Sequence, residues 1–143
     1  MMIKQYCVST LILMIVLTGC ATYSIQPKSL VDQLKTFQII KTNEYFQKFA
    51  AIEYPSNNLE KIECEDKKGN SVWLYPDKNT EFIFTTKSTG KKVKAYFDTV
   101  LFYNDTIYGL RSRLLGGLRI IPVSDIDKIS IYSEIPKIEP VPK

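Results

Sequence analysis

The sequence predicts a mainly β domain of antiparallel hairpins with one short helix at its N-terminal end. From residue 59 onward, short segments rich in branched and aromatic residues follow one another, and these residue types favour strands. Turns rich in Gly, Asn, Asp and Ser separate the segments, which is typical of hairpins. Residues 20–143 are enough chain for one hydrophobic core and too few for two ordinary domains.

The first 19 residues predict an export signal. Lys4 provides a single positive charge, and the stretch from Val8 to Leu17 is uncharged and mostly apolar. This apolar stretch has about ten residues, whereas a helix that crosses a bilayer needs about twenty. We therefore expect residues 1–19 to be a cleaved signal peptide rather than a permanent transmembrane helix.

The end of this leader, Leu17-Thr18-Gly19-Cys20, resembles the lipobox of bacterial lipoproteins. The resemblance implies cleavage before Cys20, a diacylglycerol on its sulfur and an acyl chain on the new amino terminus. Several acyl chains anchor firmly, at about 0.8 kcal/mol per buried methylene. The alternative is an unmodified cysteine in a failed transmembrane segment. The residue after Cys20 is Ala21, whereas an aspartate at this position signals inner-membrane retention in proteobacterial lipoproteins. The resemblance therefore implies an outer-membrane protein that faces the periplasm.

The segment after the lipobox is expected to be a tether followed by a helix. Residues 20–28 are polar and contain Pro27, which suits a spacer that lifts the domain off the lipid surface. Ser29 is the expected N-cap of a short helix, because apolar residues follow it at spacings of three and four, namely Leu30, Val31, Leu34 and Phe37. Residues 37–54 fit either a strand or a helix face, and the sequence leaves this choice open.

Three hairpins are expected in the middle of the chain. Their turns contain Gly69, Gly90 and Asn104-Asp105, residue types that accept the backbone conformations of tight turns. The strand pairs are residues 62–66 with 71–75, 81–86 with 91–97, and 99–103 with 106–110.

Two further strands, residues 118–121 and 126–132, flank a single 3₁₀ turn over residues 122–125. This arrangement resembles the end of small SH3-like and Sm-like barrels, over roughly residues 80–132, and implies a partly open barrel. The phrases Ile107-Tyr108-Gly109 and Ile121-Pro122-x-Ser-Asp-Ile also resemble small lipoproteins of Bacteroidota, a resemblance that implies an address and no activity. We expect one β-rich domain over residues 29–133 and a proline-rich, extended tail over residues 134–143.

The charge balance does not favour a nucleic-acid partner. The chain has 19 Lys and Arg residues, and loss of Lys4 with the leader leaves 18 against 15 Asp and Glu, a net charge of about +3. Cys7 leaves with the leader and Cys20 is used by lipid, so Cys64 would be the one remaining thiol. Since Ile62 and Cys64 share one face of a strand, we expect a buried structural thiol rather than a nucleophile.

The chain contains no histidine, which excludes Ser-His-Asp and Cys-His nucleophilic schemes and the common histidine-based zinc sites. Carboxylates are the remaining candidates for acid or base chemistry. Glu63 and Glu65 share a strand face, although alternating charges of this kind usually form a solvated face. We therefore expect no catalytic residue, no metal and no cofactor other than the covalent lipid on Cys20.

Residues 111–117 are expected to form a loop, and loops on a rigid β scaffold often carry binding residues. The candidate partner-binding residues are Arg111, Arg113 and Arg119. With Lys87, Lys91, Lys92 and Lys94 they could form one positive patch for anionic lipid or an acidic protein. The alternative is solubilising charge scattered over hairpin edges.

These expectations combine into a membrane-anchored, non-catalytic lipoprotein that binds a protein or another component of the cell envelope. Two alternatives remain open at this point. One is an immunity or protective lipoprotein of the periplasm, which would carry a compact acidic or basic face. The other is a carboxylate-based hydrolase, which would need a cleft lined by two close carboxylates.

Overall fold

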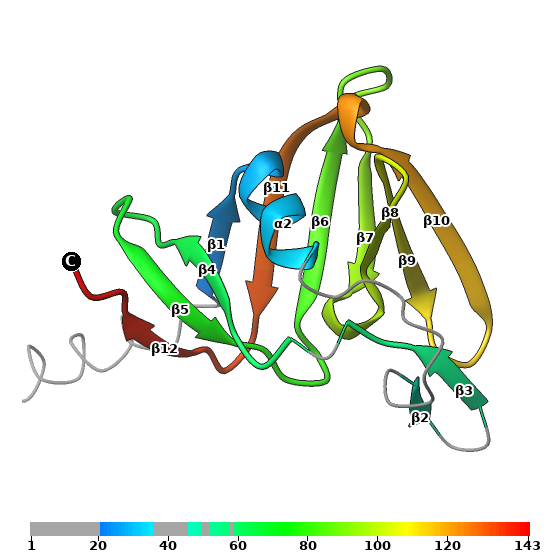
Figure 1. Cartoon of the computed structure of the whole chain (residues 1–143), viewed down its shortest axis with the longest axis horizontal. Coiled ribbons are helices and arrows are strands. Elements are labelled where there is room, and N and C mark those ends of the chain that lie inside the picture. The colour runs from blue at the N-terminus through cyan, green and yellow to red at the C-terminus, as the bar shows by residue number, and fades with distance from the viewer. Residues whose placement is uncertain (1–20, 36–45, 50–51, 58) are drawn as a thin grey trace, which may run out of the picture.

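The computed structural model describes residues 21–35, 46–49, 52–57 and 59–143. These residues form twelve strands, one α-helix and two single 3₁₀ turns (Figure 1). All strand pairs are antiparallel, and the described strands do not close into a barrel. The predicted class, a mainly β and partly open antiparallel fold with one short helix near the N-terminus, is confirmed.

The strands are arranged in three sheets. The largest has the order β12-β5-β4-β1-β11-β6-β7, the second has the order β10-β9-β8, and β2 pairs with β3 alone. The second sheet lies next to the β7 end of the first sheet, where β7 and β9 are in contact. The strand bounds are β1 Ala21–Ile25, β2 Phe46–Phe49, β3 Ile52–Pro55, β4 Ile62–Glu65, β5 Ser71–Tyr75, β6 Glu81–Thr86, β7 Lys92–Tyr96, β8 Leu101–Tyr103, β9 Thr106–Ser112, β10 Gly116–Pro122, β11 Ile126–Ser133 and β12 Lys137–Pro140.

Strand β1 lies inside the largest sheet, between β4 and β11. Its residues pair with β11 from Ala21 opposite Ser133 to Ile25 opposite Ile129. Tyr23 and Ile25 are buried. The expectation of a tether over residues 20–28 is therefore wrong for this segment. Alternating exposure explains the error: Thr22 and Ser24 are typical of a polar linker, but small polar residues also fit the more exposed face of a strand.

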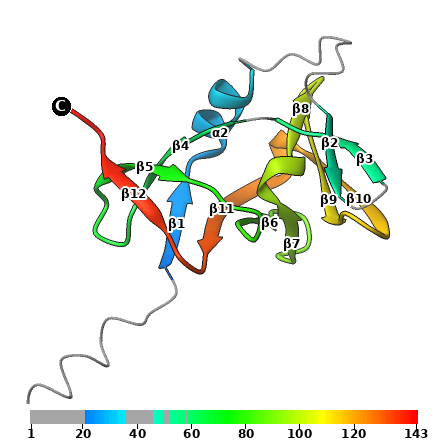
Figure 2. The same cartoon turned by 90° about the horizontal axis from the view of Figure 1, so that it is seen from below.

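The helix α2 spans Pro27–Leu34, which is earlier than expected. Ser29 lies inside it and is not its N-cap; Pro27 occupies the first turn, where a missing N–H costs nothing. Leu30, Val31 and Leu34 are buried, as their spacing predicts. The helix packs against β11 and β8 and so covers the join between the two larger sheets (Figure 2).

The three predicted hairpins are confirmed as β4–β5, β6–β7 and β8–β9. Asn104 and Asp105 both have positive φ, which the tight β8–β9 turn requires. The described parts of the segment that the sequence left open form strands β2 and β3 rather than a helix.

The predicted 3₁₀ turn is also confirmed. It spans Val123–Asp125 and joins β10 to β11. A second 3₁₀ turn, η2 at Phe97–Thr99, joins β7 to β8 and was not predicted. Phe97 is buried in η2, on the face that Val93 and Ala95 share in β7.

The last strand, β12, corrects the expectation of a separate tail over residues 134–143. It pairs with β5 at the edge of the largest sheet. The backbone N–H of Val141 donates to Ser71 O. The backbone N–H groups of the odd-numbered residues along this segment therefore point toward β5, and those of the even-numbered residues point away from it. The prolines have even numbers and stand where a missing N–H faces away from the sheet, which an edge strand tolerates. They are Pro136, Pro140 and Pro142.

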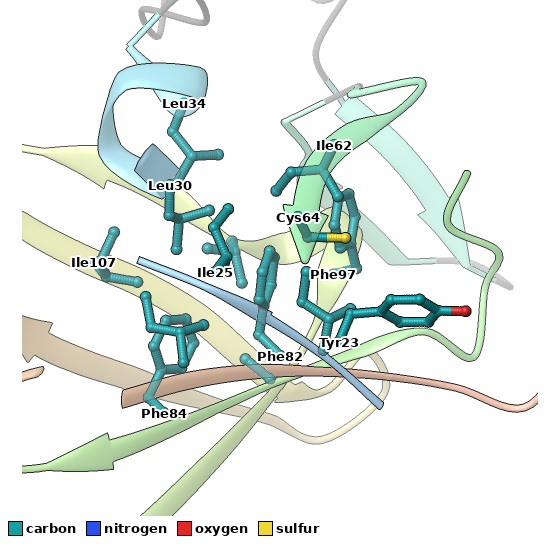
Figure 3. Close-up of a cluster of buried hydrophobic side chains, with 14 of the residues drawn as sticks. Tyr23, Ile25, Leu30, Leu34, Ile62, Cys64, Phe82, Phe84, Phe97 and Ile107 are labelled. Atoms are coloured by element: carbon teal, nitrogen blue, oxygen red, sulfur yellow. The ribbon is translucent and has the colours of Figure 1, made fainter. Parts of the chain in front are cut away.

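The hydrophobic core lies between the largest sheet, α2 and the inner face of the second sheet (Figure 3). Its largest members are the fully buried Phe82, Phe84 and Phe97. The ring of Phe82 stacks on Phe97 with a centroid distance of 4.8 Å and lies 5.6 Å from Phe84. Because β6 supplies two of these rings and η2 the third, the core connects both larger sheets.

Gly109 marks the closest approach of β9 to β7. A Cβ atom at this position would lie 2.7 Å from the Cβ of Ala95 and 3.4 Å from Cγ2 of Val100. We expect Gly109→Ala to lower the free energy of unfolding by about 1–3 kcal/mol, because one strand must move away from the other. Chemical denaturation measures this loss. Adding Ala95→Gly removes the clashing atom and should restore much of it; an unchanged stability of Gly109→Ala would contradict the close approach.

Candidate functional site

The predicted anchor and cleavage residues, Leu17, Thr18, Gly19 and Cys20, lie outside the described residues. Ala21, the residue after Cys20, is the first residue of β1. No helix among the described residues is long and apolar enough to cross a membrane.

The predicted binding loop at residues 111–117 is a tight hairpin connection between β9 and β10. Strand β9 continues to Ser112, and β10 begins at Gly116, where positive φ values at Gly116 and Gly117 close the turn. Arg111 and Arg119 lie on the two strands and Arg113 lies in the turn. The structure therefore does not bring the three arginines together in one exposed loop.

Arg113 turns back into the molecule, and its side chain is only 8% exposed. Its Nη2 atom donates to Asp98 Oδ1 at 2.8 Å and to the backbone oxygen of Lys78 at 2.8 Å. Its guanidinium carbon lies 4.0 Å from the centroid of the Tyr96 ring, which is cation–π distance. The prediction that Arg113 is an exposed partner-binding residue is wrong, because these contacts fix it between β9, β7 and η2.

Asp98 is held from two sides. Its Oδ1 accepts from Arg113, and its Oδ2 accepts from the hydroxyl of Tyr54 on β3. Burial, followed by the hydrogen bond to Asp98, raises the pKa of Tyr54. Burial lowers the pKa of Arg113, but the hydrogen bond and charge of Asp98 outweigh it, so that its pKa is raised. The cluster therefore holds a neutral phenol, a carboxylate and a guanidinium, and it stabilises the fold.

A cleft of about 340 Å³ lies beside this cluster. Asn57 lines this cleft. Its buried side chain is held in place by hydrogen bonds that it donates to the backbone oxygens of Phe97 and Val100, at 2.8 and 2.9 Å. Asp77 also faces the cleft, but its Oδ1 accepts from the Asn79 N–H and the Thr80 hydroxyl of its own turn. Both carboxylates of the cleft, Asp77 and Asp98, thus have structural partners.

Cys64 on β4 is buried, as predicted. Burial raises the pKa of the thiol from its ordinary value of 9.0 to about 12, and the nearby carboxylates add to this effect. Glu63 is half-buried and Glu65 is exposed on the other face of the strand. At neutral pH the thiol is protonated and enclosed, so it acts as a small apolar side chain.

We expect Cys64 to resist alkylation in the native protein. The shift in pKa from 9.0 to about 12 lowers the thiolate fraction roughly 1,000-fold, and burial adds to the protection. Iodoacetamide at pH 8, followed by peptide mapping, should therefore modify Cys64 at least about 100-fold more slowly in buffer than in urea. Equal rates would show that the thiol is accessible.

The same shift predicts a pH effect on stability. Above about pH 9 the unfolded chain loses the thiol proton, whereas the folded chain keeps it until about pH 12. The unfolded state then binds fewer protons, so stability should fall as the pH rises through this window. Urea denaturation between pH 8 and 11 measures the fall, and Cys64→Ala serves as control because it should show a smaller fall than the unaltered chain.

The outer face of the second sheet is an exposed apolar surface. Leu118 and Ile120 on β10 are 57% and 59% exposed, and Tyr103 on β8 is 64% exposed. The register places Leu110 beside Leu118 and Tyr108 between Ile120 and Leu101, all on this face. We call this set the outer apolar face; its residues are Leu101, Tyr103, Tyr108, Leu110, Leu118 and Ile120.

Strand β10 adds two features to this surface. Among the described strands it pairs with β9 alone, so its second edge carries no strand partner. Arg119 projects from β10 on the face opposite Leu118 and Ile120, and Arg111 lies diagonally from it on β9. Neither arginine forms an ion pair with a described residue, so both positive charges are available to a ligand.

The sequence prediction missed both the Tyr54–Asp98–Arg113 cluster and the outer apolar face. The cluster joins three segments that are far apart in the chain, so no local pattern indicates it. The face does have a signal: Leu118 and Ile120 alternate with Gly117 and Arg119, as in a strand with one apolar side. The sequence predicts a strand here but does not indicate which side of it is buried, and the structure places Leu118 and Ile120 on the exposed side.

Two of the lysines proposed for one positive patch, Lys87 and Lys91, lie apart from Arg113. Lys87 and Lys91 belong to the β6–β7 turn, at the opposite end of β7 from the Tyr96 ring that Arg113 covers. Within the described ranges, no three His, Cys, Asp or Glu side chains are grouped so that they could hold a metal ion. Neither a protein family, nor a curated protein, nor a solved structure matches this chain.

Proposed function

We propose that the chain is an exported bacterial lipoprotein, anchored in the outer membrane by acyl chains on Cys20, whose β domain binds a protein of the cell envelope without catalysis. The lipobox-like Leu17-Thr18-Gly19-Cys20 supports the anchor. The outer apolar face, at the free edge of β10, is the observation that carries the binding role.

The partner that fits this surface is an extended segment of an envelope protein. A strand added beside β10 would satisfy backbone groups of its free edge, which is a common mode of peptide recognition. Its apolar residues would cover Leu118 and Ile120 on one side of the sheet. An acidic residue on the other side would lie beside Arg119, whose charge has no counter-ion among the described residues.

The carboxylates of the cleft support a non-catalytic role. General acid or base chemistry needs a carboxyl group that is free to exchange a proton with substrate. Both oxygens of Asp98 accept hydrogen bonds from Tyr54 and Arg113, and Asp77 caps its own turn. A bound substrate would therefore have to compete with the contacts that fold this region.

Metabolic labelling with an alkyne fatty acid tests the anchor. The unaltered chain should carry the label and fractionate with outer membranes, and Cys20→Ala should lose both properties. Mass spectrometry of the purified protein should place the acyl chains on residue 20. A purified chain that begins at Met1 and has a free thiol at residue 20 would overturn the anchor.

Photo-crosslinking in intact cells tests the binding role. A crosslinking amino acid at position 118 or 120 should give one discrete adduct, whereas the same amino acid at Lys91 should give none. Arg119→Glu should reduce that adduct at least about ten-fold, because it brings like charges together. Arg111→Glu makes the same charge change one strand away and should have a smaller effect. An adduct that both charge changes leave intact would contradict binding along β10.

A further inference from the structure

Strand β1 begins at Ala21, so no spacer separates the proposed lipid on Cys20 from the folded domain. Ala21 already pairs with Ser133 of β11, and Cys20 is the residue directly before it. Consecutive Cα atoms are about 3.8 Å apart, so an acylated Cys20 lies within one residue of the sheet. This step rests on the proposed function, because it requires the acyl chains to be on Cys20.

One end of the molecule is therefore fixed close to the bilayer, and the strand register shows what lies there. Ala21 is opposite Ser133, the neighbouring Tyr132 is opposite Glu81, and Glu81 is opposite Tyr96. The contact of Arg113 with the Tyr96 ring brings the β9–β10 turn to the same end. In Figure 1 the start of β1, the β11–β12 connection and the β9–β10 turn all lie along the lower side, and Figure 2 views the molecule from that side.

Two of the connections at this end carry large, exposed apolar side chains. In the β9–β10 turn, Leu115 is 90% exposed and Leu114 is 55% exposed. In the β11–β12 connection, Ile135 is 82% exposed. Turns normally consist of Gly, Asn, Asp, Ser and Pro, so exposed leucine and isoleucine at two turn tips need another explanation.

The opposite end provides the internal comparison. The β6–β7 turn there contains Lys87, Ser88, Thr89 and Gly90, and the β8–β9 turn contains Asn104 and Asp105. These turns are polar, as water-facing turns usually are. Among the described turns, the exposed leucines and isoleucine lie at the end that carries Ala21, which also has the polar β5–β6 turn over residues 76–80.

We propose that this end rests on the membrane, with Leu114, Leu115 and Ile135 inserted at the boundary between headgroups and acyl chains. The charges nearby are mixed, with exposed Lys78 and Lys137 beside exposed Glu134. The contact is therefore mainly apolar and depends little on anionic lipid. With Cys20 and two apolar tips at one end, the domain has a fixed orientation, and the free edge of β10 stands along the side of the molecule.

Quenching by brominated phospholipids tests this orientation in the full, acylated protein. Trp73 is the single tryptophan of the chain and is replaced by Phe, and one tryptophan is then placed at position 115, 135 or 91. In vesicles of brominated phosphatidylcholine, Leu115→Trp and Ile135→Trp should lose about half of their emission or more, because the tips reach about 5–10 Å into the interface. Lys91→Trp, at the opposite end, should keep its emission.

Mass spectrometry of the same samples separates two ways of failing. If residue 20 carries acyl chains and positions 115 and 135 are quenched no more than position 91, the orientation is wrong and the anchor remains. If residue 20 carries no acyl chain, the proposed function fails and this inference fails with it. All three substitutions are at exposed positions, and circular dichroism confirms that each variant is folded before its quenching is compared.

Discussion

Phe82→Ala is expected to lower the free energy of unfolding by about 3–5 kcal/mol, the range for removing a large aromatic side chain from a core. Phe82 has no solvent exposure, and its ring lies between Phe84 on its own strand and Phe97 on η2. Its loss opens a cavity where the two larger sheets meet, which the surrounding strands can fill only in part. Urea denaturation followed by circular dichroism measures the change.

Ile83→Ala is the matched control for Phe82. Ile83 is the next residue on β6, points to the other face of the sheet and is half-exposed. Its truncation removes less buried surface and should cost less than half as much as the truncation of Phe82. Similar losses for the two variants would contradict the position of the core between the sheets.

Arg113→Ala is expected to cost about 2–3 kcal/mol of stability, because it leaves the Asp98 carboxylate and the Lys78 carbonyl without their charged donor. Asp98 is 31% exposed, so water compensates in part, and the loss stays below that of a fully buried pair. Arg113→Lys should recover only part of the loss, because an ammonium group cannot match the planar guanidinium on the Tyr96 ring.

Arg111→Ala is the control for this prediction, since Arg111 is exposed and lies two residues before Arg113, on β9. Its stability should stay within about 0.5 kcal/mol of the unaltered chain. A double-mutant cycle with Asp98→Asn should give a coupling energy of about 1 kcal/mol or more between residues 98 and 113. Equal effects of the two arginine substitutions would show that Arg113 behaves as a surface charge.

The sequence predicts the local elements of this fold well, because the hairpins are encoded by nearby residues. The β6–β7 hairpin is an example: branched and aromatic residues alternate on both sides of Gly90, whose positive φ the turn needs. The 3₁₀ turn before β11 is similar, since Pro122 interrupts the strand pattern just where η3 begins. In both cases pattern and turn chemistry lie within about ten residues of each other.

The errors concern segments whose structure depends on distant partners. β1 forms because β11 and β4 border it, and no feature of residues 21–25 alone distinguishes a strand from a polar linker. β12 forms because the edge of β5 accepts it despite Pro140. Arg113 is buried because Asp98 and Tyr54 meet it from two other segments.

The central place of β1 also sets an order of events for the proposed export of the chain. Residue 21 pairs with residue 133, so under this proposal the middle of the largest sheet cannot assemble until residue 133 has crossed the inner membrane. Such long-range pairing forms slowly, because a large loop must close first. For the proposed acylation of Cys20, this delay keeps the modification site extended and accessible to processing enzymes, and the sheet then closes over a finished anchor.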